Sequence, residues 1–200
     1  MFRIVSLIIG YFLGSISFAY FIGRSQHTDL RKKGSGNLGT TNTIRVLGKK
    51  YGAINFILDL AKSIAAFYIC YNLFKTDALT AAFYGSTGAI LGHDFPFYLK
   101  FKGGKGVAAA IGMMKANWNL ATIITIVIGV CFGLSGYISL GSMVFVVTIP
   151  IVLALMHYSL EIVLITVGIA ILTLVKHKEN IIRLKNGNEN KLFNKKKHTS

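Results

Sequence analysis

Two glycine-rich stretches of this chain contain residue types suited to binding an anion. The first, "GSGNLGTTN" from Gly34 to Asn42, places three glycines among hydroxyl and amide side chains. Such a run leaves backbone N–H groups free to line a concave site, and the polar side chains add donors. The letters "TTNTIRVLG" that follow are typical of a short helix whose N-terminus would face that site. Arg45 lies in the first turns of this helix, where its planar guanidinium group could donate two hydrogen bonds to phosphate oxygens.

Other interpretations of the first stretch are weaker. Gly34, Gly36 and Gly39 match the dinucleotide pattern G-x-G-x-x-G, which needs a buried strand before it. The preceding "HTDLRKK" is too charged for such a strand, and the acidic residue expected about 20 positions later would be Asp59, inside an apolar run. No stretch fits the phosphate-loop pattern G-x-x-x-x-G-K-[ST]. The remaining alternative is a flexible loop before a helix capped by Thr41 or Asn42.

The second stretch, "FKGGKGVAAAIG", surrounds Lys105 with Gly103, Gly104 and Gly106 at the start of an apolar segment. A glycine turn at a helix N-terminus lets the backbone approach an anion closely, which predicts a second anion site. Upstream, His93 and Asp94 are neighbours in sequence, and adjacent side chains rarely face each other. For them we expect a structural role.

The third polar stretch is "KHKENIIRLKNGNE", near the C-terminus. His177, Asn180 and Arg183 recur every third residue and therefore share one face of a helix. That face could present an imidazole and an amide to a phosphate or a glycerol hydroxyl. Alternatively, the histidine is only a surface residue at a helix end.

The rest of the chain predicts an all-α membrane protein. Of its 200 residues, 53% are hydrophobic and 14% charged, whereas soluble domains carry about 25% charged residues. No linker or repeat divides it, so we expect one domain over residues 1–200 with a basic tail at 186–200. The apolar runs predict helices at 4–23, 51–74, 78–92, 107–114, 118–137, 141–156 and 159–175.

Charge decides between six and seven crossings. With seven, the loops at 24–50, 93–105 and 136–141 and the segment 176–200 share one side and hold 18 of the 22 Lys and Arg residues. By the positive-inside rule that side is cytoplasmic, and the N-terminus lies outside. Six crossings would place the basic tail outside. We therefore predict seven transmembrane helices, with an active site formed by the cytoplasmic loops.

Several classes of partner are not expected. Cys70 and Cys131 lie in apolar runs, and no His, Cys or carboxylate cluster has metal-ligand spacing, so we expect no metal and no cofactor. Nucleic-acid binding is not expected, because no stacking aromatics are interleaved with the basic residues in a soluble module. Asp59 and Lys62 lie at positions i and i+3 within an apolar run. Placing two charged side chains inside a membrane costs free energy, which suggests that the pair has a function.

Together the stretches "GSISFAYFIGR", "RKKGSGNLGTTNTIRVLGKKYG", "GHDFPFYLKFKGGKGVAA", "YISLGS" and "HKENIIRLKNGNE" resemble the bacterial acylphosphate:glycerol-3-phosphate acyltransferase family, in order and spacing, along nearly the whole chain. The resemblance implies a multi-pass enzyme of the bacterial inner membrane whose active site faces the cytoplasm. It would transfer a fatty acyl group from acyl phosphate to the 1-hydroxyl of sn-glycerol 3-phosphate, giving lysophosphatidate for phospholipid synthesis. It also implies a functional link to the enzyme that makes acyl phosphate.

The resemblance further implies residue roles. Lys105, His177, Arg45 and Asn180 would be catalytic, Ser139 and Ser142 would position substrate, and Asp59 and Lys62 would support the site structurally. The phosphate-binding residues would be Ser35, Gly36, Asn37, Gly39, Thr41, Asn42, Gly103 and Gly104. The chain departs from the family pattern at Ser17, where proline is usual, and through small-residue exchanges at Thr40, Ser63 and Ala109.

A second function class remains open. A small membrane transporter or flippase for a phosphorylated anion would also need basic glycine loops, but inverted repeats would favour it and none is visible. The H-x-x-x-x-D motif of acyltransferases that use thioester donors is absent after every histidine. This absence favours an activated donor such as acyl phosphate.

Overall fold

The structure, a computed structural model, describes residues 1–116 and 120–191, and every regular element in these ranges is helical. The predicted all-α class is therefore confirmed for the described chain. The α-helices are α1 (Phe2–Ser15), α2 (Phe18–Ser25), α3 (Thr40–Leu47), α4 (Lys49–Leu73), α5 (Ala78–Asp94), α6 (Val107–Ala116), α7 (Leu120–Gly133), α8 (Ile138–Leu155), α9 (Leu160–Lys176) and α10 (Lys178–Lys185). Three short 3₁₀ turns join them: η1 (Leu30–Lys32), η2 (Lys75–Asp77) and η3 (Phe97–Leu99).

Most predicted apolar runs coincide with helices to within a few residues. The run at 118–137 is shorter than predicted, because α7 ends at Gly133, and the start of that prediction lies outside the described residues. The run at 141–156 begins earlier, at Ile138. The third polar stretch does not simply continue the last helix, since α10 is bent by 59° from α9.

The prediction of one unbroken first helix is wrong. Its backbone is extended at Ile16 and Ser17, between α1 and α2. The polar groups freed by this break are satisfied by side chains. Lys62 Nζ donates to Ile16 O at 3.0 Å, and Tyr98 OH donates to Ser15 O at 2.9 Å while accepting from Ser17 N–H at 3.0 Å. Such pairing is what allows a broken helix inside a membrane protein.

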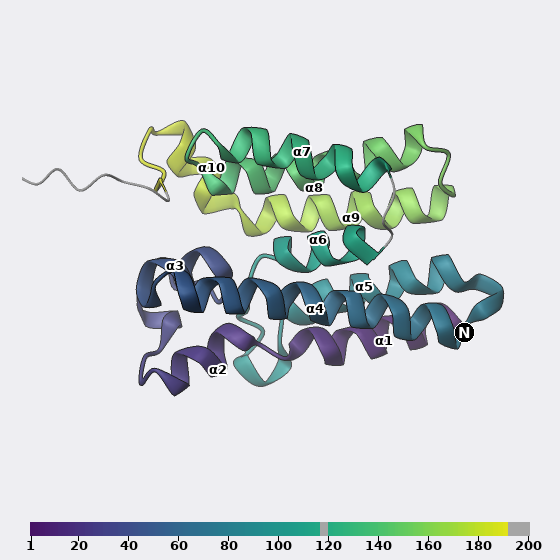
Figure 1. Cartoon of the computed structure of the whole chain (residues 1–200), viewed down its shortest axis with the longest axis horizontal. Helices are drawn as coiled ribbons and strands as arrows, with labels where there is room; N and C mark the ends of the chain where they lie inside the picture. The colour runs from purple at the N-terminus through teal and green to yellow at the C-terminus, as the bar shows by residue number, and fades with distance from the viewer. Residues whose placement is uncertain (117–119, 192–200) are drawn as a thin grey trace, which may run out of the picture.

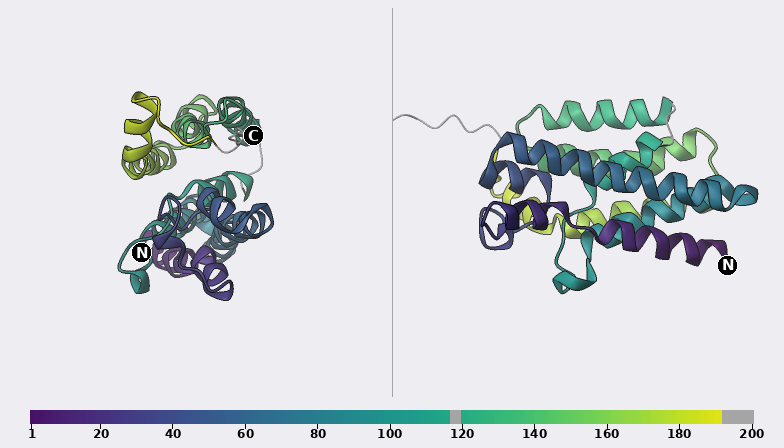
Figure 2. Two further views of the ribbon diagram at one scale, coloured as in Figure 1. Left: turned by 90° about the vertical axis from the view of Figure 1, so that its left-hand side faces the viewer. Right: turned by 60° about the horizontal axis from the view of Figure 1, so that its bottom comes forward.

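The helices form two groups, with α6 between them. Figure 1 and the left panel of Figure 2 show α1–α5 on one side and α7–α10 on the other. Helices α1 and α5 pack closely because Gly88 has no side chain: a Cβ at this position would lie 2.2 Å from Leu7 O. A buried core joins the groups through α5, α6 and α8, with Phe83, Met113 and Ile149 among its members.

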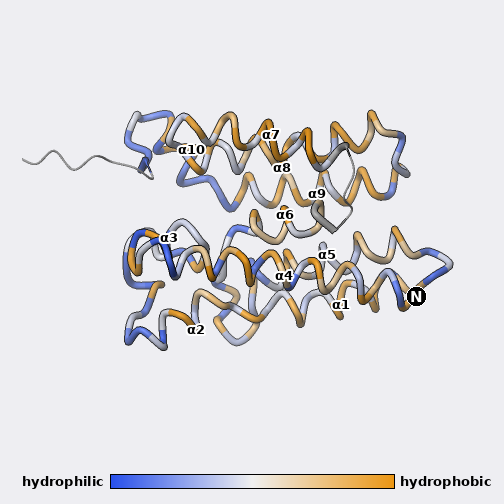
Figure 3. Tube along the Cα trace, viewed as in Figure 1, coloured by the Kyte–Doolittle hydropathy of each residue, from blue (hydrophilic) through white to orange (hydrophobic). Residues whose placement is uncertain are grey.

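The apolar surface is distributed as a membrane requires. In Figure 3 the middle of the bundle is hydrophobic and both ends are hydrophilic, with α3 and α10 at the same end. Three spans are long and apolar enough to cross a bilayer, Phe2–Ser25, Lys49–Leu73 and Ile138–Leu155, with a fourth if α9 and α10 are one bent span. Helices α5 and α7 are shorter, and the seven crossings and their orientation stay predictions.

Candidate active site

The polar stretches singled out in the sequence converge on one cavity at the α3 and α10 end of the bundle. Its volume is about 690 Å³. The residues around it come from the first glycine loop, α3, the second glycine loop, the starts of α6 and α8, and the α9–α10 bend. Of the predicted site residues, it is lined by Ser35, Gly36, Asn37, Gly39, Thr41, Asn42, Arg45, Asp59, Gly103, Lys105, Ser139, Ser142, His177 and Asn180.

The first glycine loop is shaped by Asn42. Gly34 and Gly36 have φ values of +61° and +70°, a conformation that side chains rarely adopt. Asn42 is buried beneath them, accepts from Ser35 N–H at 2.7 Å and donates to the carbonyls of Leu30 and Lys33 at 3.1 Å. Although Asn42 lines the cavity, its amide is occupied by the loop. It therefore braces the loop and does not offer free donors.

Helix α3 presents its N-terminus to the cavity without a side-chain cap. Its N-cap is Gly39, so neither Thr41 nor Asn42 acts as a cap, and the first N–H groups of the helix lack intrahelical acceptors. The Thr40 hydroxyl is buried without a hydrogen-bond partner in the described chain. Arg45 is exposed at the cavity, and no described carboxylate pairs with it. The start of α3 and the Arg45 guanidinium therefore have no carboxylate bound to them among the described residues.

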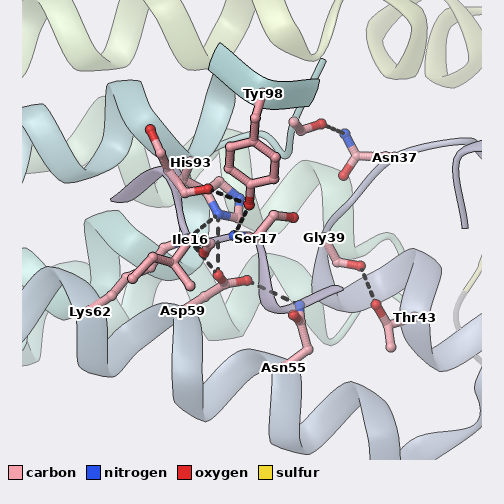
Figure 4. A network of polar contacts seen from close by, with 12 residues as sticks. Ile16, Ser17, Asn37, Gly39, Thr43, Asn55, Asp59, Lys62, His93 and Tyr98 are labelled. Atoms are coloured by element: carbon pink, nitrogen blue, oxygen red, sulfur yellow. Dashed lines mark hydrogen bonds and ion pairs between the residues drawn. The ribbon is translucent and has the colours of Figure 1, made fainter. Parts of the chain in front are cut away.

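The second glycine loop is closed by its own backbone. Gly103 N–H donates to Asp94 O at 3.1 Å and Gly104 N–H to His93 O at 2.9 Å, which returns the chain to the end of α5. Gly106, at φ +70°, then turns it into α6. Asn37 Nδ2 donates to Gly103 O at 3.4 Å, so the two glycine loops touch and form one composite site (Figure 4).

Gly104 does not line the cavity, in contrast to its predicted phosphate-binding role. It packs against the His93 imidazole, and a Cβ at this position would collide with His93 Nε2. A glycine is needed at position 104 because the His93 imidazole lies directly against the backbone of the second glycine loop. His93 and Asp94 do not act as a pair: His93 points to α4, while the Asp94 carboxylate is buried with no hydrogen-bond partner among described residues.

Beneath the loops lies a buried polar network that reaches α4 (Figure 4). Lys62 Nζ is 2.9 Å from Asp59 Oδ1 and 3.0 Å from His93 Nδ1. Asn55 Nδ2 donates to the other carboxylate oxygen of Asp59 at 3.0 Å. All four side chains are buried. The network thus joins the helix break at Ile16, through Lys62, to the second glycine loop, through His93.

Helix α10 completes the cavity from the opposite group of helices. Lys105 Nζ donates to Asn180 Oδ1. Asn180 Nδ2 donates to Glu189 Oε1 at 2.7 Å, Ser139 Oγ donates to the same oxygen at 2.9 Å, and Arg183 Nε donates to Glu189 Oε2 at 2.8 Å. Burial opposes ionisation of Glu189, but these hydrogen bonds hold its pKa below the ordinary value. One carboxylate therefore organises three surrounding donors.

His177 lies just beyond the end of α9, and it is neutral. Its Nδ1 lies 2.8 Å from Thr173 O, an acceptor, so Nδ1 carries the proton and Nε2 keeps a free lone pair. Burial lowers the pKa of the imidazole to about 4, and the contact with Thr173 only partly offsets this. Since His177 lines the cavity, it can accept a hydrogen bond from a ligand hydroxyl.

Sequence reasoning missed Glu189 and His93 as site residues. Glu189 is the one acidic residue in the segment 186–200, whose other charged side chains are basic. This contrast in charge is the one signal in the sequence that points to it. Its importance comes from three donors that lie 6, 9 and 50 positions away. His93 was expected to be structural, and it does hold the loop; its contacts with α4 span 31 positions or more.

The chemistry of the cavity is that of anion binding. Two helix N-termini, α3 and α6, border it together with Arg45 and Lys105. Burial, followed by the charge of Arg183, lowers the pKa of the Lys105 ammonium, and the charges of Glu179 and Glu189 offset this only in part. Such an arrangement suits ligands with phosphate groups.

An apolar groove of about 430 Å³ adjoins the cavity between α6, α7 and α8. Val107, Ile111, Ile138 and Ser142 line both, so the two spaces are continuous. The groove runs along α7 past Val130 toward Ile126. A ligand with an anionic head and an apolar tail could occupy both spaces together.

Comparison with known proteins gives a consistent result. The family model described as "Glycerol-3-phosphate acyltransferase" matches residues 4–187. Glycerol-3-phosphate acyltransferase of Shouchella clausii is 40% identical over 200 residues, covering 96% of this chain and 97% of the relative. That of Thermotoga petrophila is 38% identical over 190 residues, covering 92% and 94%.

Solved structures agree with the sequence relatives. The crystal structure of PlsY, an integral membrane glycerol 3-phosphate acyltransferase, in its glycerol 3-phosphate form matches with a TM-score of 0.89 and 34% identity over 96% of each chain. Its lysophosphatidic acid form matches with a TM-score of 0.85 and 33% identity over 94% of each chain.

Proposed function

The chain belongs to the glycerol-3-phosphate acyltransferase family, and we propose that it transfers a fatty acyl group from acyl phosphate to the 1-hydroxyl of sn-glycerol 3-phosphate. The product would be lysophosphatidate for phospholipid synthesis. The observation that carries this proposal is the composite anion site, in which Asn37 joins the two glycine loops and α3 and α6 direct their N-termini at one cavity. Both substrates carry a phosphate group that this site can hold.

In the proposed reaction, the 1-hydroxyl oxygen attacks the acyl carbonyl carbon and the phosphate of the donor leaves. Arg45, Lys105 and the backbone N–H groups stabilise the negative charge that develops on the carbonyl and phosphate oxygens. His177 Nε2 accepts a hydrogen bond from glycerol 3-phosphate and positions it. A substrate phosphate oxygen takes the hydroxyl proton, because phosphate is already a good leaving group and little base activation is needed.

Asn180 and Ser142 complete the site in this proposal. Asn180 is held by Glu189 and contacts Lys105, so it orients the ammonium that faces the substrate. Ser142 lines both cavity and groove, where the carbonyl of the donor would lie. The apolar groove receives the acyl chain. Ser139 supports the site indirectly, because its hydroxyl is bonded to Glu189.

The location of the site supports a membrane enzyme that faces the cytoplasm. The cavity lies at the end of the bundle that holds most of the described basic residues, which the positive-inside rule places in the cytoplasm. Seven crossings, with the N-terminus outside and the C-terminus inside, are proposed on the same grounds. The enzyme that makes acyl phosphate would then have to deliver it to this side of the membrane.

A transporter or flippase for a phosphorylated anion is the alternative. Transporters bind substrate near the middle of the bilayer between two repeats. Here the anion site lies at one end of the bundle, and a buried core of large side chains fills the middle. The geometry therefore favours the enzyme.

The test is direct. Purified protein in detergent is incubated with acyl phosphate and radiolabelled glycerol 3-phosphate, and the lipid products are separated. We expect labelled lysophosphatidate, none when acyl-CoA replaces acyl phosphate, and unchanged activity in excess EDTA. Inorganic phosphate should inhibit by competing for the site. Efficient transfer from acyl-CoA, or loss of activity on chelation, would contradict the proposed mechanism.

A further inference from the structure

Four glycines of the α7–α8 region line the apolar groove. Gly136 has a φ of +88°, which favours glycine, and two of the others are required by helix packing. A Cβ on Gly129 would lie 2.7 Å from Phe145 Cβ, and one on Gly141 would lie 2.6 Å from Gly129 O. Both distances are shorter than real Cβ contacts. Gly129 and Gly141 therefore let α7 and α8 approach each other.

Gly133 has no such requirement. A Cβ built on it would meet no atom of the described residues within 4 Å, and its backbone is helical at the end of α7. It is half-buried and lines the groove, so the open space in front of it is part of the groove. Neither packing nor backbone conformation explains a glycine at this position.

The position of Gly133 along the groove is informative. Its backbone nitrogen would lie 2.8 Å from a Cβ on Gly141, so Gly133 is next to the start of α8. Ser142, which follows Gly141 in α8, lines both the anion cavity and the groove. Gly133 therefore lies near the point where the groove leaves the cavity, and it shares the lining of the groove with Val107 and Ile111 of α6.

We propose that Gly133 is a specificity-determining residue that keeps the entrance of this groove open to the acyl chain of a long-chain donor. The inference rests on the proposed function and adds to it the residue that admits the chain. An acyl chain is the occupant because the groove is apolar and continues directly from a cavity built for its phosphate head. A soluble phosphorylated metabolite has no part that matches these walls.

The effect of Gly133 should be steric. A long acyl chain reaches the enzyme from the bilayer, so moving it into the groove brings little hydrophobic gain, and shape decides which chains bind. A side chain at position 133 would narrow the entrance in proportion to its volume. It would obstruct chains that pass this point and spare donors too short to reach it.

The experiment compares donors of different length. Initial rates with butanoyl phosphate and hexadecanoyl phosphate are measured for the wild type and for Gly133→Ala, Gly133→Val and Gly133→Leu. We expect the ratio of hexadecanoyl to butanoyl transfer to fall progressively along this series, by about tenfold or more for leucine. The KM for glycerol 3-phosphate should stay unchanged.

The matched control is Gly168→Leu. Gly168 is a helical glycine of α9 whose built Cβ also meets no atom of the described part of the chain within 4 Å, but it lines neither the cavity nor the groove. Its substitution should leave the ratio between donors unchanged. An equal loss with both donors in the Gly133 series, or an unchanged ratio, would overturn the inference.

A binding measurement separates this inference from the proposed reaction. Lysophosphatidate with a photoreactive group on a hexadecanoyl chain should label wild-type α7 and α8, and label Gly133→Leu much less. Labelling without turnover by any acyl phosphate would contradict the proposed function while supporting the groove. Equal labelling of wild type and Gly133→Leu would refute the role of Gly133.

Discussion

Asn180 donates through Nδ2 to Glu189 Oε1 at 2.7 Å, and this hydrogen bond turns its Oδ1 toward Lys105. An amide has one donor end and one acceptor end, so occupying the first with a carboxylate orients the second. The buried carboxylate of Glu189 thereby decides where the Lys105 ammonium is held. A residue of the C-terminal segment acts in this way on a glycine loop more than 80 positions earlier.

Loss of Glu189 should destabilise the protein. Glu189→Ala removes the acceptor for Asn180, Ser139 and Arg183, and leaves Arg183 partly buried without its close partner. We expect a loss of roughly 3 kcal/mol in the free energy of unfolding, measured by thermal unfolding in detergent, together with loss of activity. Glu179→Ala is the control, since Glu179 is 82% exposed and lies 3.6 Å from the same arginine. It should change stability by less than about 0.5 kcal/mol.

Arg45→Ala and Lys105→Ala should each reduce kcat/KM by about 100-fold or more, because each removes a positioned cation from developing negative charge. Both proteins should still insert in the membrane and unfold at nearly the wild-type temperature. Lys50→Ala, at the exposed start of α4, should retain activity. If all three variants behaved alike, the basic residues would serve topology alone.

The contribution of His177 should not depend on pH near neutrality. Its pKa is lowered from 6.5 to about 4, so the native side chain is neutral above about pH 5.5. In the unfolded chain the imidazole takes a proton near its ordinary pKa, so stability is present above that value and falls as pH drops from 6.5 toward 4.

For activity, we expect His177→Asn to lower kcat/KM by a factor that stays constant between about pH 6 and pH 8. The quantity to compare is the ratio of wild-type to variant rates, which cancels the titration of the substrate phosphate. A ratio that changed steeply near the ordinary histidine pKa would show that His177 is a titrating base.

Topology can be tested with cysteine variants in a Cys70→Ala, Cys131→Ala background. Thr76→Cys, in the turn beside Lys75, should react with an impermeant thiol reagent applied to intact cells. Asn37→Cys and Lys185→Cys, at the cavity end of the bundle, should react only after the cells are opened. Labelling of position 185 from outside would contradict the proposed orientation.

The helix break offers a double-mutant cycle. Tyr98→Phe removes the acceptor for Ser17 N–H and the donor to Ser15 O, and should lower stability by about 1–2 kcal/mol. In a Ser17→Pro background the N–H is already absent, and the backbone at Ser17 (φ −89°) is near that of proline. Tyr98→Phe should then cost less. Equal costs in both backgrounds would show that the Ser17 contact is unimportant.

The sequence by itself determined the helical class, most helix bounds and the regions that form the cavity. These features depend on local patterns: long apolar runs, glycines at turns, and polar side chains at helix ends. The break at Ile16 escaped prediction because the run around it, residues 4–23, carries no charge and is long enough to cross a bilayer as one helix. The carbonyl and N–H groups exposed there are satisfied by Lys62 and Tyr98, which are distant in sequence.

Only the tertiary structure decided which of these residues face the substrate and which support them. Asn42 and Gly104 carry the same sequence signals as Asn37 and Gly103, yet Asn42 braces its own loop and Gly104 covers His93. Glu189 gained its role because the fold brings Ser139, Asn180 and Arg183 around it. A side chain's partners depend on the packing of whole helices, whereas local sequence records only its own backbone preferences and polarity.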